Sequence, residues 1–183
     1  MVKSSVPSAP PTGGPKREEQ APLRILVVDD DPAILNVWRR VLGPKWRPSS
    51  KELESLEKKL FGAAPSGPSP DAAFSIETAS QGQEGFQKVV AALEEGRPYT
   101  FALVDMRMPP GWDGMETISR MIQKDPRLEV AICSAFSDIT REEVARRVGR
   151  ADLPWLRKPF DLEVARDLAR KLTELGIQRR HSR

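Results

Sequence analysis

Three consecutive acidic residues follow a short apolar run near the start of the chain. In the stretch LRILVVDDDPAIL, Asp29, Asp30 and Asp31 come directly after the strand-forming residues 24–28. One carboxylate at such a place is commonly the cap of the next helix, and Asp31, next to Pro32, is the expected cap here. Clustered carboxylates repel and raise one another's pKa unless a cation is present. Asp29 and Asp30 therefore indicate a cation site.

Chemically useful side chains also follow three later apolar runs. Asp105 ends the run in FALVDMRMPPGWDG, Ser134 ends the run in VAICSAF, and Lys158 follows the run in WLRKPF. If these runs are parallel strands, their carboxyl ends meet at the edge of the sheet where functional groups lie. Clustered carboxylate oxygens suit Mg²⁺, a carboxylate can become an aspartyl-phosphate, and positive charge and donors stabilise a transferring phosphoryl group. The combination predicts phosphoryl transfer.

Short apolar runs alternate with amphipathic stretches along most of the chain. The expected strands are 24–28, 74–78, 100–104, 128–134 and 154–157. The expected helices are 32–42, 81–95, 114–124, 139–148 and 162–175. Expected helix N-caps are Ser80, Asp138 and Asp161, and the expected residues beyond helix ends are Gly96 and Gly176. The alternation predicts an α/β fold with a doubly wound, five-stranded parallel sheet and helices on both faces.

Three segments stand apart from this alternation. Residues 1–22 are rich in Pro, Ser and Gly and are predicted to be a disordered N-terminal tail. Residues 43–73 form an insertion inside the expected domain, 23–176. Its capping-box spacing and apolar face predict an extra amphipathic helix, which packs either on the domain itself or on a partner. Residues 177–183 form a basic C-terminal tail, interpreted as a solvated helix end.

Composition limits the remaining possibilities. The net charge is +3, and the three arginines of the tail equal it, so the basic balance is weak evidence for nucleic-acid binding and none is expected. No apolar stretch is long enough to cross a bilayer, and the N-terminus lacks the apolar centre of a secretory signal. A single cysteine, Cys133, cannot form an internal disulfide and is expected to be buried. These features predict a cytoplasmic protein.

Taken together, ILVVDDDPAIL, LVDMRMPPGWDG, CSAF and RKPF, in this order and spacing, resemble the receiver domain of two-component response regulators, a CheY-like, flavodoxin-like fold. The resemblance covers roughly 23–176 apart from the insertion and implies the strand order 2-1-3-4-5. It implies that Asp105 is the phosphoacceptor. It also implies that Asp29, Asp30 and Asp105, with the backbone carbonyl of Arg107, bind Mg²⁺, for which Mn²⁺ is expected to substitute.

The same resemblance implies roles for residues at the last two strands. Ser134 corresponds to the switch hydroxyl that turns toward the phosphoryl group, and Lys158 to the lysine that contacts it. The bond from Lys158 to Pro159 is expected to be cis. Trp155 stands where the family has its rotating aromatic residue, usually Tyr or Phe.

This sequence departs from the family pattern in the loop after Asp105. The loop is one residue longer, and Trp112 is expected over the site. Arg107 and Phe136 occupy the two positions that tune dephosphorylation, and their size predicts a long-lived phosphoryl state.

The resemblance also sets the expected partners. The only histidine, His181, lies in the tail, so a separate histidine kinase or histidine phosphotransfer protein is expected to donate the phosphoryl group. Output is expected through the face formed by 139–148, 154–157 and 162–175, acting on a downstream protein or through a phosphorylation-dependent dimer. The chain is either a stand-alone receiver or part of a larger hybrid kinase.

Two other classes of protein remain as alternatives. A pseudo-receiver would keep the fold and bind partners without being phosphorylated. A phosphatase of the haloacid-dehalogenase type would use Asp29 and Asp31 as its acid pair, but that scheme leaves Asp105 without a role, and no further acidic strand end follows Lys158. We therefore expect a signalling receiver rather than an enzyme.

Overall fold

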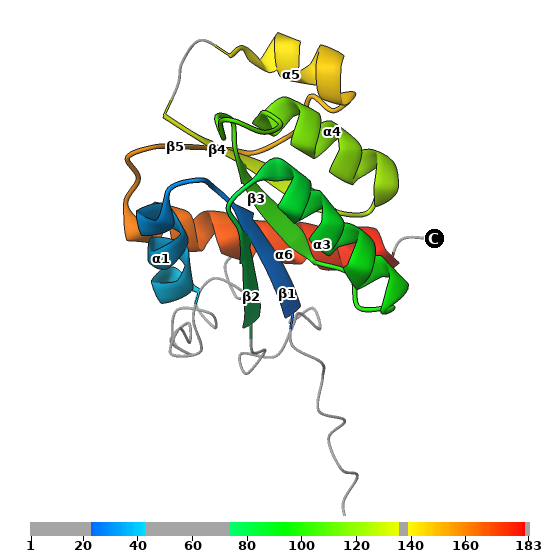
Figure 1. Ribbon diagram of the computed structural model, residues 1–183. Coiled ribbons are helices and arrows are strands. Elements are labelled where there is room, and N and C mark those ends of the chain that lie inside the picture. Colours follow the sequence, from blue (N-terminus) through cyan, green and yellow to red (C-terminus); the bar gives the residue numbers. More distant parts are fainter. Residues whose placement is uncertain (1–22, 43–73, 136–138, 182–183) are drawn as a thin grey trace, which may run out of the picture.

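A five-stranded parallel sheet forms the centre of the molecule. The computed structural model describes residues 23–42, 74–135 and 139–181 (Figure 1). The strands are β1 (Leu23–Val28), β2 (Phe74–Ala79), β3 (Phe101–Asp105), β4 (Glu129–Ser134) and β5 (Trp155–Arg157). Their spatial order is β2-β1-β3-β4-β5, and every neighbouring pair is parallel. The predicted doubly wound α/β fold and strand order are confirmed.

Helices cover both faces of this sheet (Figure 1). They are α1 (Pro32–Val41), α3 (Gly82–Glu94), α4 (Gly114–Lys124), α5 (Arg141–Val148) and α6 (Leu162–His181). Leu26, Val104 and Ile132 pack with residues of α3, α4 and α5 in one core cluster. The strand residues that alternate with these point to the other face of the sheet, where they pack with α1 and α6 in the second core cluster. Side chains of a strand point alternately to its two faces, so a strand covered on both sides is apolar throughout.

Two helix starts differ from the sequence prediction. Helix α3 begins at Gly82 with Gln81 at its N-cap, so the prediction of Ser80 as the cap was wrong. Ser80 instead donates its backbone N–H and its hydroxyl to Glu84 Oε2. Helix α5 begins at Arg141, and the Thr140 hydroxyl accepts from the Glu143 N–H. Thr140 is therefore its cap rather than Asp138, which lies outside the described residues.

The last helix does not end where the sequence suggested. Helix α6 runs through Gly176 to His181, so most of the predicted tail 177–183 is part of it. Gly176 is buried, and a Cβ added to it would overlap with the carbonyl oxygen of Thr100. The glycine therefore serves the close approach of α6 to the start of β3, and the prediction that it stops the helix was wrong.

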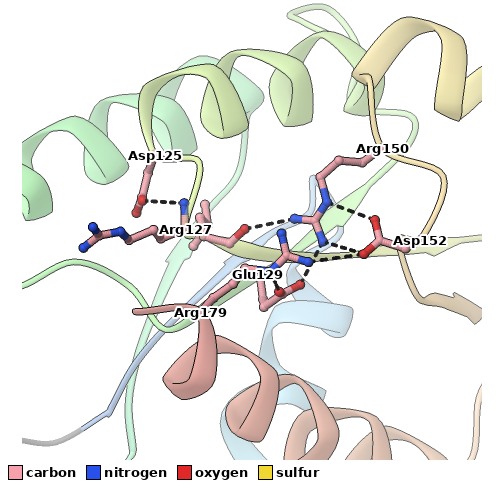
Figure 2. A network of polar contacts seen from close by, with 7 residues as sticks. Asp125, Arg127, Glu129, Arg150, Asp152 and Arg179 are labelled. Carbon is pink, nitrogen blue, oxygen red and sulfur yellow. Dashed lines mark hydrogen bonds and ion pairs between the residues drawn. The ribbon is translucent and has the colours of Figure 1, made fainter. Parts of the chain in front are cut away.

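A network of ion pairs fastens this end of α6 to the sheet (Figure 2). Its centre is Glu129, the first residue of β4, which is 1% exposed. Arg150 Nη2 lies 3.1 Å from Glu129 Oε2, and Arg179 on α6 contacts the other carboxylate oxygen. Asp152 accepts hydrogen bonds from both arginines. The network ties the start of β4, the connection from α5 to β5 and the end of α6 together.

The next arginine on α6 has partners of its own. Arg180 Nη2 lies 2.7 Å from Asp125 Oδ2, and its Nε donates to the carbonyl oxygen of Tyr99 at 3.1 Å. The interpretation of this segment as a solvated helix end was therefore wrong.

Several predictions concern residues that the structure does not describe. The tail 1–22, for which disorder was predicted, the insertion 43–73, for which an extra helix was predicted, and Phe136 lie outside the described residues. Within the part of the chain that the structure describes, no helix combines the length and apolar character needed to span a bilayer.

Candidate functional site

The acidic triplet at the end of β1 divides as its sequence suggested. Asp29 is buried, and its Oδ1 accepts from the Asp31 backbone N–H at 3.0 Å. Asp30 is exposed. The Asp31 side chain caps α1, accepting from the Ala33 N–H at 2.8 Å. Asp31 is thus committed to the helix, while Asp29 and Asp30 lie at the carboxyl edge of the sheet.

Asp105 lies at the end of the neighbouring strand, β3. Its side chain is largely buried, and Oδ1 accepts from the backbone N–H of Met106 at 2.7 Å. This local hydrogen bond fixes the orientation of the carboxylate. The other oxygen, Oδ2, faces the side chain of Lys158.

Lys158 follows β5 and reaches back across the sheet edge to both buried carboxylates. Its Nζ lies 2.6 Å from Asp29 Oδ2 and 3.2 Å from Asp105 Oδ2. Its backbone N–H donates to the carbonyl oxygen of Ser134 at 2.9 Å, and the bond to Pro159 is cis. Strand ends that are far apart in the sequence therefore meet at one place.

Burial and ion pairing have opposite effects on the pKa values of Asp29 and Lys158. Burial raises the pKa of the Asp29 carboxyl, and the nearby Asp105 carboxylate adds to the effect, although Lys158 opposes it. Burial also disfavours the charged form of Lys158, but its pairs with Asp29 and Asp105 outweigh this and raise its pKa. The lysine is therefore a fixed positive charge between two carboxylates.

The acidic residues of the site also form a cluster that could hold a cation. Asp29, Asp30 and Asp105 each offer a carboxylate oxygen, and these oxygens lie within 4.8 Å of one another. Mg²⁺ prefers oxygen ligands and keeps several waters, so two buried acids beside an exposed one fit it well. The donor set suits Mg²⁺ or Mn²⁺ better than a metal that favours sulfur or nitrogen.

Comparison with known proteins agrees with this geometry. The family described as the response regulator receiver domain matches residues 69–170, more than half of the chain. The chain belongs to this family. Its matched range begins near the end of the insertion, and the structure adds β1, which Asp29 and Asp30 follow, between β2 and β3 of the same sheet.

Two curated proteins and one solved structure illustrate the similarity. Sporulation initiation phosphotransferase F of Bacillus subtilis is 32% identical over 101 residues, which cover 51% of this chain and 78% of that protein. The DNA-binding transcriptional regulator NtrC of Salmonella typhimurium is 38% identical over 82 residues, covering 45% of this chain and only 17% of NtrC. A CheY-like receiver domain of Methanospirillum hungatei has a TM-score of 0.57 at 21% identity, covering 86% of this chain and 99% of its own.

This membership defines the general role of the chain. It is the receiver domain of a two-component response regulator, a signalling module rather than a classical enzyme. Receiver domains bind Mg²⁺ at an acidic pocket and interact with histidine kinases or phosphotransfer proteins, and the aspartate cluster described above could hold such an ion.

The other predicted residues of the receiver domain take the following places. Ser134, at the end of β4, is largely buried, and Trp155, at the start of β5, is partly buried with the Arg141 guanidinium 5.7 Å from its ring centroid. Arg107 is exposed. Cys133 is 2% exposed, and burial raises its pKa to about 12, as expected of a small core residue rather than a reactive thiol.

The loop after Asp105 takes a course that the sequence did not reveal. The ring of Trp112 packs against Phe86 on α3, with centroids 5.9 Å apart, and the Arg120 guanidinium lies 4.3 Å from its centroid. Gln81 and Gln83 bond to the backbone of the same loop. The contacts of Trp112 are thus with α3 and α4, and the expectation that it covers the acidic cluster was wrong. A local pattern gives no sign of such partners, since they come from a different segment.

Proposed function

We propose that Asp105 accepts a phosphoryl group from a phosphohistidine of a kinase or phosphotransfer protein, in a Mg²⁺-dependent reaction. The observation that carries this proposal is the position of the Lys158 ammonium, within 3.2 Å of both Asp29 and Asp105, beside carboxylates that lie within 4.8 Å of one another. Clustered acids with an opposing lysine are the parts that phosphoryl transfer to a carboxylate requires.

The residues of the site have distinct tasks in this reaction. A carboxylate oxygen of Asp105 attacks the phosphorus atom while the bond from phosphorus to the donor imidazole nitrogen breaks, and the electron pair returns to that nitrogen. The Met106 N–H holds the carboxylate in place. Lys158 contributes positive charge to the oxygens of the arriving group, and Ser134 contributes a hydroxyl donor. Asp29 and Asp30, with the Arg107 carbonyl, would hold Mg²⁺, which supplies further charge neutralisation.

The proposed signal passes from the site to the surface through the last strands. Ser134 ends β4, and the Lys158 N–H bonds to its carbonyl oxygen, so the two residues that face the phosphoryl group are already joined. Trp155 on β5 pairs in register with Ile132 on β4. A shift of Ser134 toward a phosphoryl oxygen would disturb the packing of Trp155. The face formed by α5, β5 and α6 is the proposed contact surface for a downstream protein or a second copy.

The proposal is tested by chemical phosphorylation of the full chain. Wild type treated with a small acyl phosphate and Mg²⁺ is expected to gain one phosphoryl group by intact mass and to change its tryptophan fluorescence. Asp105→Asn, which keeps the size of the side chain, is expected to do neither. Failure of the wild type to react would favour the pseudo-receiver, which binds partners without phosphorylation. Sustained turnover of a phosphate monoester would instead favour the phosphatase.

A further inference from the structure

The loop between β3 and α4 is fastened to the start of α3 by two glutamines. Gln81 Nε2 donates to the carbonyl oxygen of Pro109 at 3.2 Å, and the Trp112 backbone N–H donates to Gln83 Oε1 at 3.3 Å. Between them lies Gly111, where an added Cβ would come 2.5 Å from Gln83 Oε1 and 2.6 Å from Gln81 Oε1. A side chain at this position would therefore have to displace the ends of the two glutamine side chains. We call these two side chains the glutamine pair.

Aromatic packing holds the far end of the same loop. The ring of Trp112 lies between Phe86 on α3 and Arg120 on α4. The Asp113 side chain then caps α4 by accepting from the Glu116 N–H at 2.7 Å. Because both helices contribute contacts, the loop is held from two sides.

The fastened part of the loop is joined directly to the backbone at Arg107. Met106 and Met108, on either side of Arg107, are buried in the core. The Met106 carbonyl oxygen accepts from the Gly114 N–H at 3.0 Å, and that of Met108 accepts from the Gly111 N–H at 3.3 Å. Pro109, to which Gln81 bonds, is thus separated from Arg107 by Met108 alone.

We propose that the glutamine pair positions the loop for metal binding at the acidic cluster. Gln81 and Gln83 do not belong to the cluster, and they act through the loop backbone that bears the Arg107 carbonyl. A ligand already held in place loses less conformational entropy when the metal binds. This inference rests on the proposed function, because Arg107 is itself a proposed ligand.

The experiment measures metal affinity without any phosphodonor. Mn²⁺ is titrated into the full chain, and free Mn²⁺ is followed by electron paramagnetic resonance. Gln83→Met removes the acceptor for the Trp112 N–H at similar size, and Gln81→Met removes the donor to Pro109. Each is expected to weaken Mn²⁺ binding by about tenfold, the lower end of the loss typical of residues that orient metal ligands. Gln123→Met, on α4 and bonded to Ser119, is the matched control and is expected to bind like wild type.

The outcomes separate this inference from the proposed function. If the wild type does not bind Mn²⁺, the metal site itself is refuted. If the wild type binds and both glutamine variants bind equally well, only the positioning role is overturned. Gln83→Glu keeps an acceptor oxygen for Trp112 and is expected to bind at least as tightly as wild type, whereas weak binding by this variant would also overturn the role. Thermal unfolding of each variant shows that the fold is retained.

Discussion

Arg179, near the end of the last helix, forms an ion pair with Glu129, the buried first residue of strand β4. Removing one member of a buried pair leaves the other charge without compensation. Glu129→Gln leaves Arg150 and Arg179 with Asp152 as their remaining acidic partner, so we expect it to lower the free energy of unfolding by about 1–3 kcal/mol. Urea unfolding measures this. Glu174→Gln, on the exposed side of α6, is the control, and equal effects of the two changes would contradict the prediction.

Asp152 gives the same network a pH dependence of known sign. Its hydrogen bond from Arg150 lowers the pKa of the Asp152 carboxyl below its usual value. A lowered folded-state pKa gives stability that is present above about pH 4 and is lost as the pH falls through the folded-state pKa. We expect Asp152→Asn to lower the free energy of unfolding by less than about 1 kcal/mol at neutral pH, because the side chain is mostly exposed. The difference from wild type should shrink on acidification, and a difference that grows would contradict the assignment.

Asp30 and Asp31 are neighbours with separable tasks. Asp30→Asn removes a proposed ligand and should weaken Mg²⁺ binding by at least about tenfold, since changes outside the ligand shell already cause such losses. Asp31→Asn should leave Mg²⁺ affinity close to that of wild type, because Asp31 caps α1. Asparagine is itself a good cap, so its stability should change little, whereas Asp31→Ala should lose about 1 kcal/mol. Calorimetric Mg²⁺ titration together with urea unfolding checks all three variants.

For a substitution of Gly176 by alanine, helix propensity alone predicts a gain in stability, whereas we expect a loss. Alanine stabilises the interior of an exposed helix relative to glycine by about 1 kcal/mol. At Gly176 the added methyl group would overlap with the Thr100 carbonyl, so we expect Gly176→Ala to destabilise the protein by about 1–3 kcal/mol. The measurement is the midpoint of urea unfolding, with Lys171→Ala at an exposed position of α6 as the control. A stabilised Gly176→Ala would show that α6 does not approach β3 so closely.

The lifetime of the proposed phosphoryl group depends on Arg107. A long exposed side chain two positions after Asp105 is expected to obstruct the water that attacks the phosphoryl group. We therefore expect Arg107→Ala to shorten the lifetime of phosphorylated protein, followed by intact mass in the presence of Mg²⁺ after removal of the donor. Arg127→Ala, at an exposed position on the α4–β4 connection, should leave the lifetime unchanged. A wild-type half-life of seconds would contradict the expected obstruction.

The sequence allowed the acidic site to be predicted because its members follow strands. Asp29, Asp105 and Lys158 come at the ends of apolar runs, and the carboxyl ends of parallel strands meet at one edge. The ion pairs of Arg179 and Arg180 could not be predicted, because their partners lie far away in the sequence and no local pattern links them. Gly176 was misread for a related reason. A glycine near the end of a helical pattern usually marks its end, and only the position of Thr100 shows that this one permits close packing.

The ion pairs and the close glycine contact that join helix α6 to other elements lie toward its C-terminal end, while Ala165 and Ala169 pack in the core nearer its start. Its C-terminal part is held by Gly176 against Thr100 and by Arg179 and Arg180, whereas its first residue, Leu162, comes shortly after Lys158. If a helix is anchored mainly near one end, a force on its other end tilts the helix about the anchored part. A displacement at Lys158 would therefore change the tilt of α6, with the largest excursion at Leu162 and almost none at Gly176. The C-terminal end of α6 would be the point about which the helix tilts.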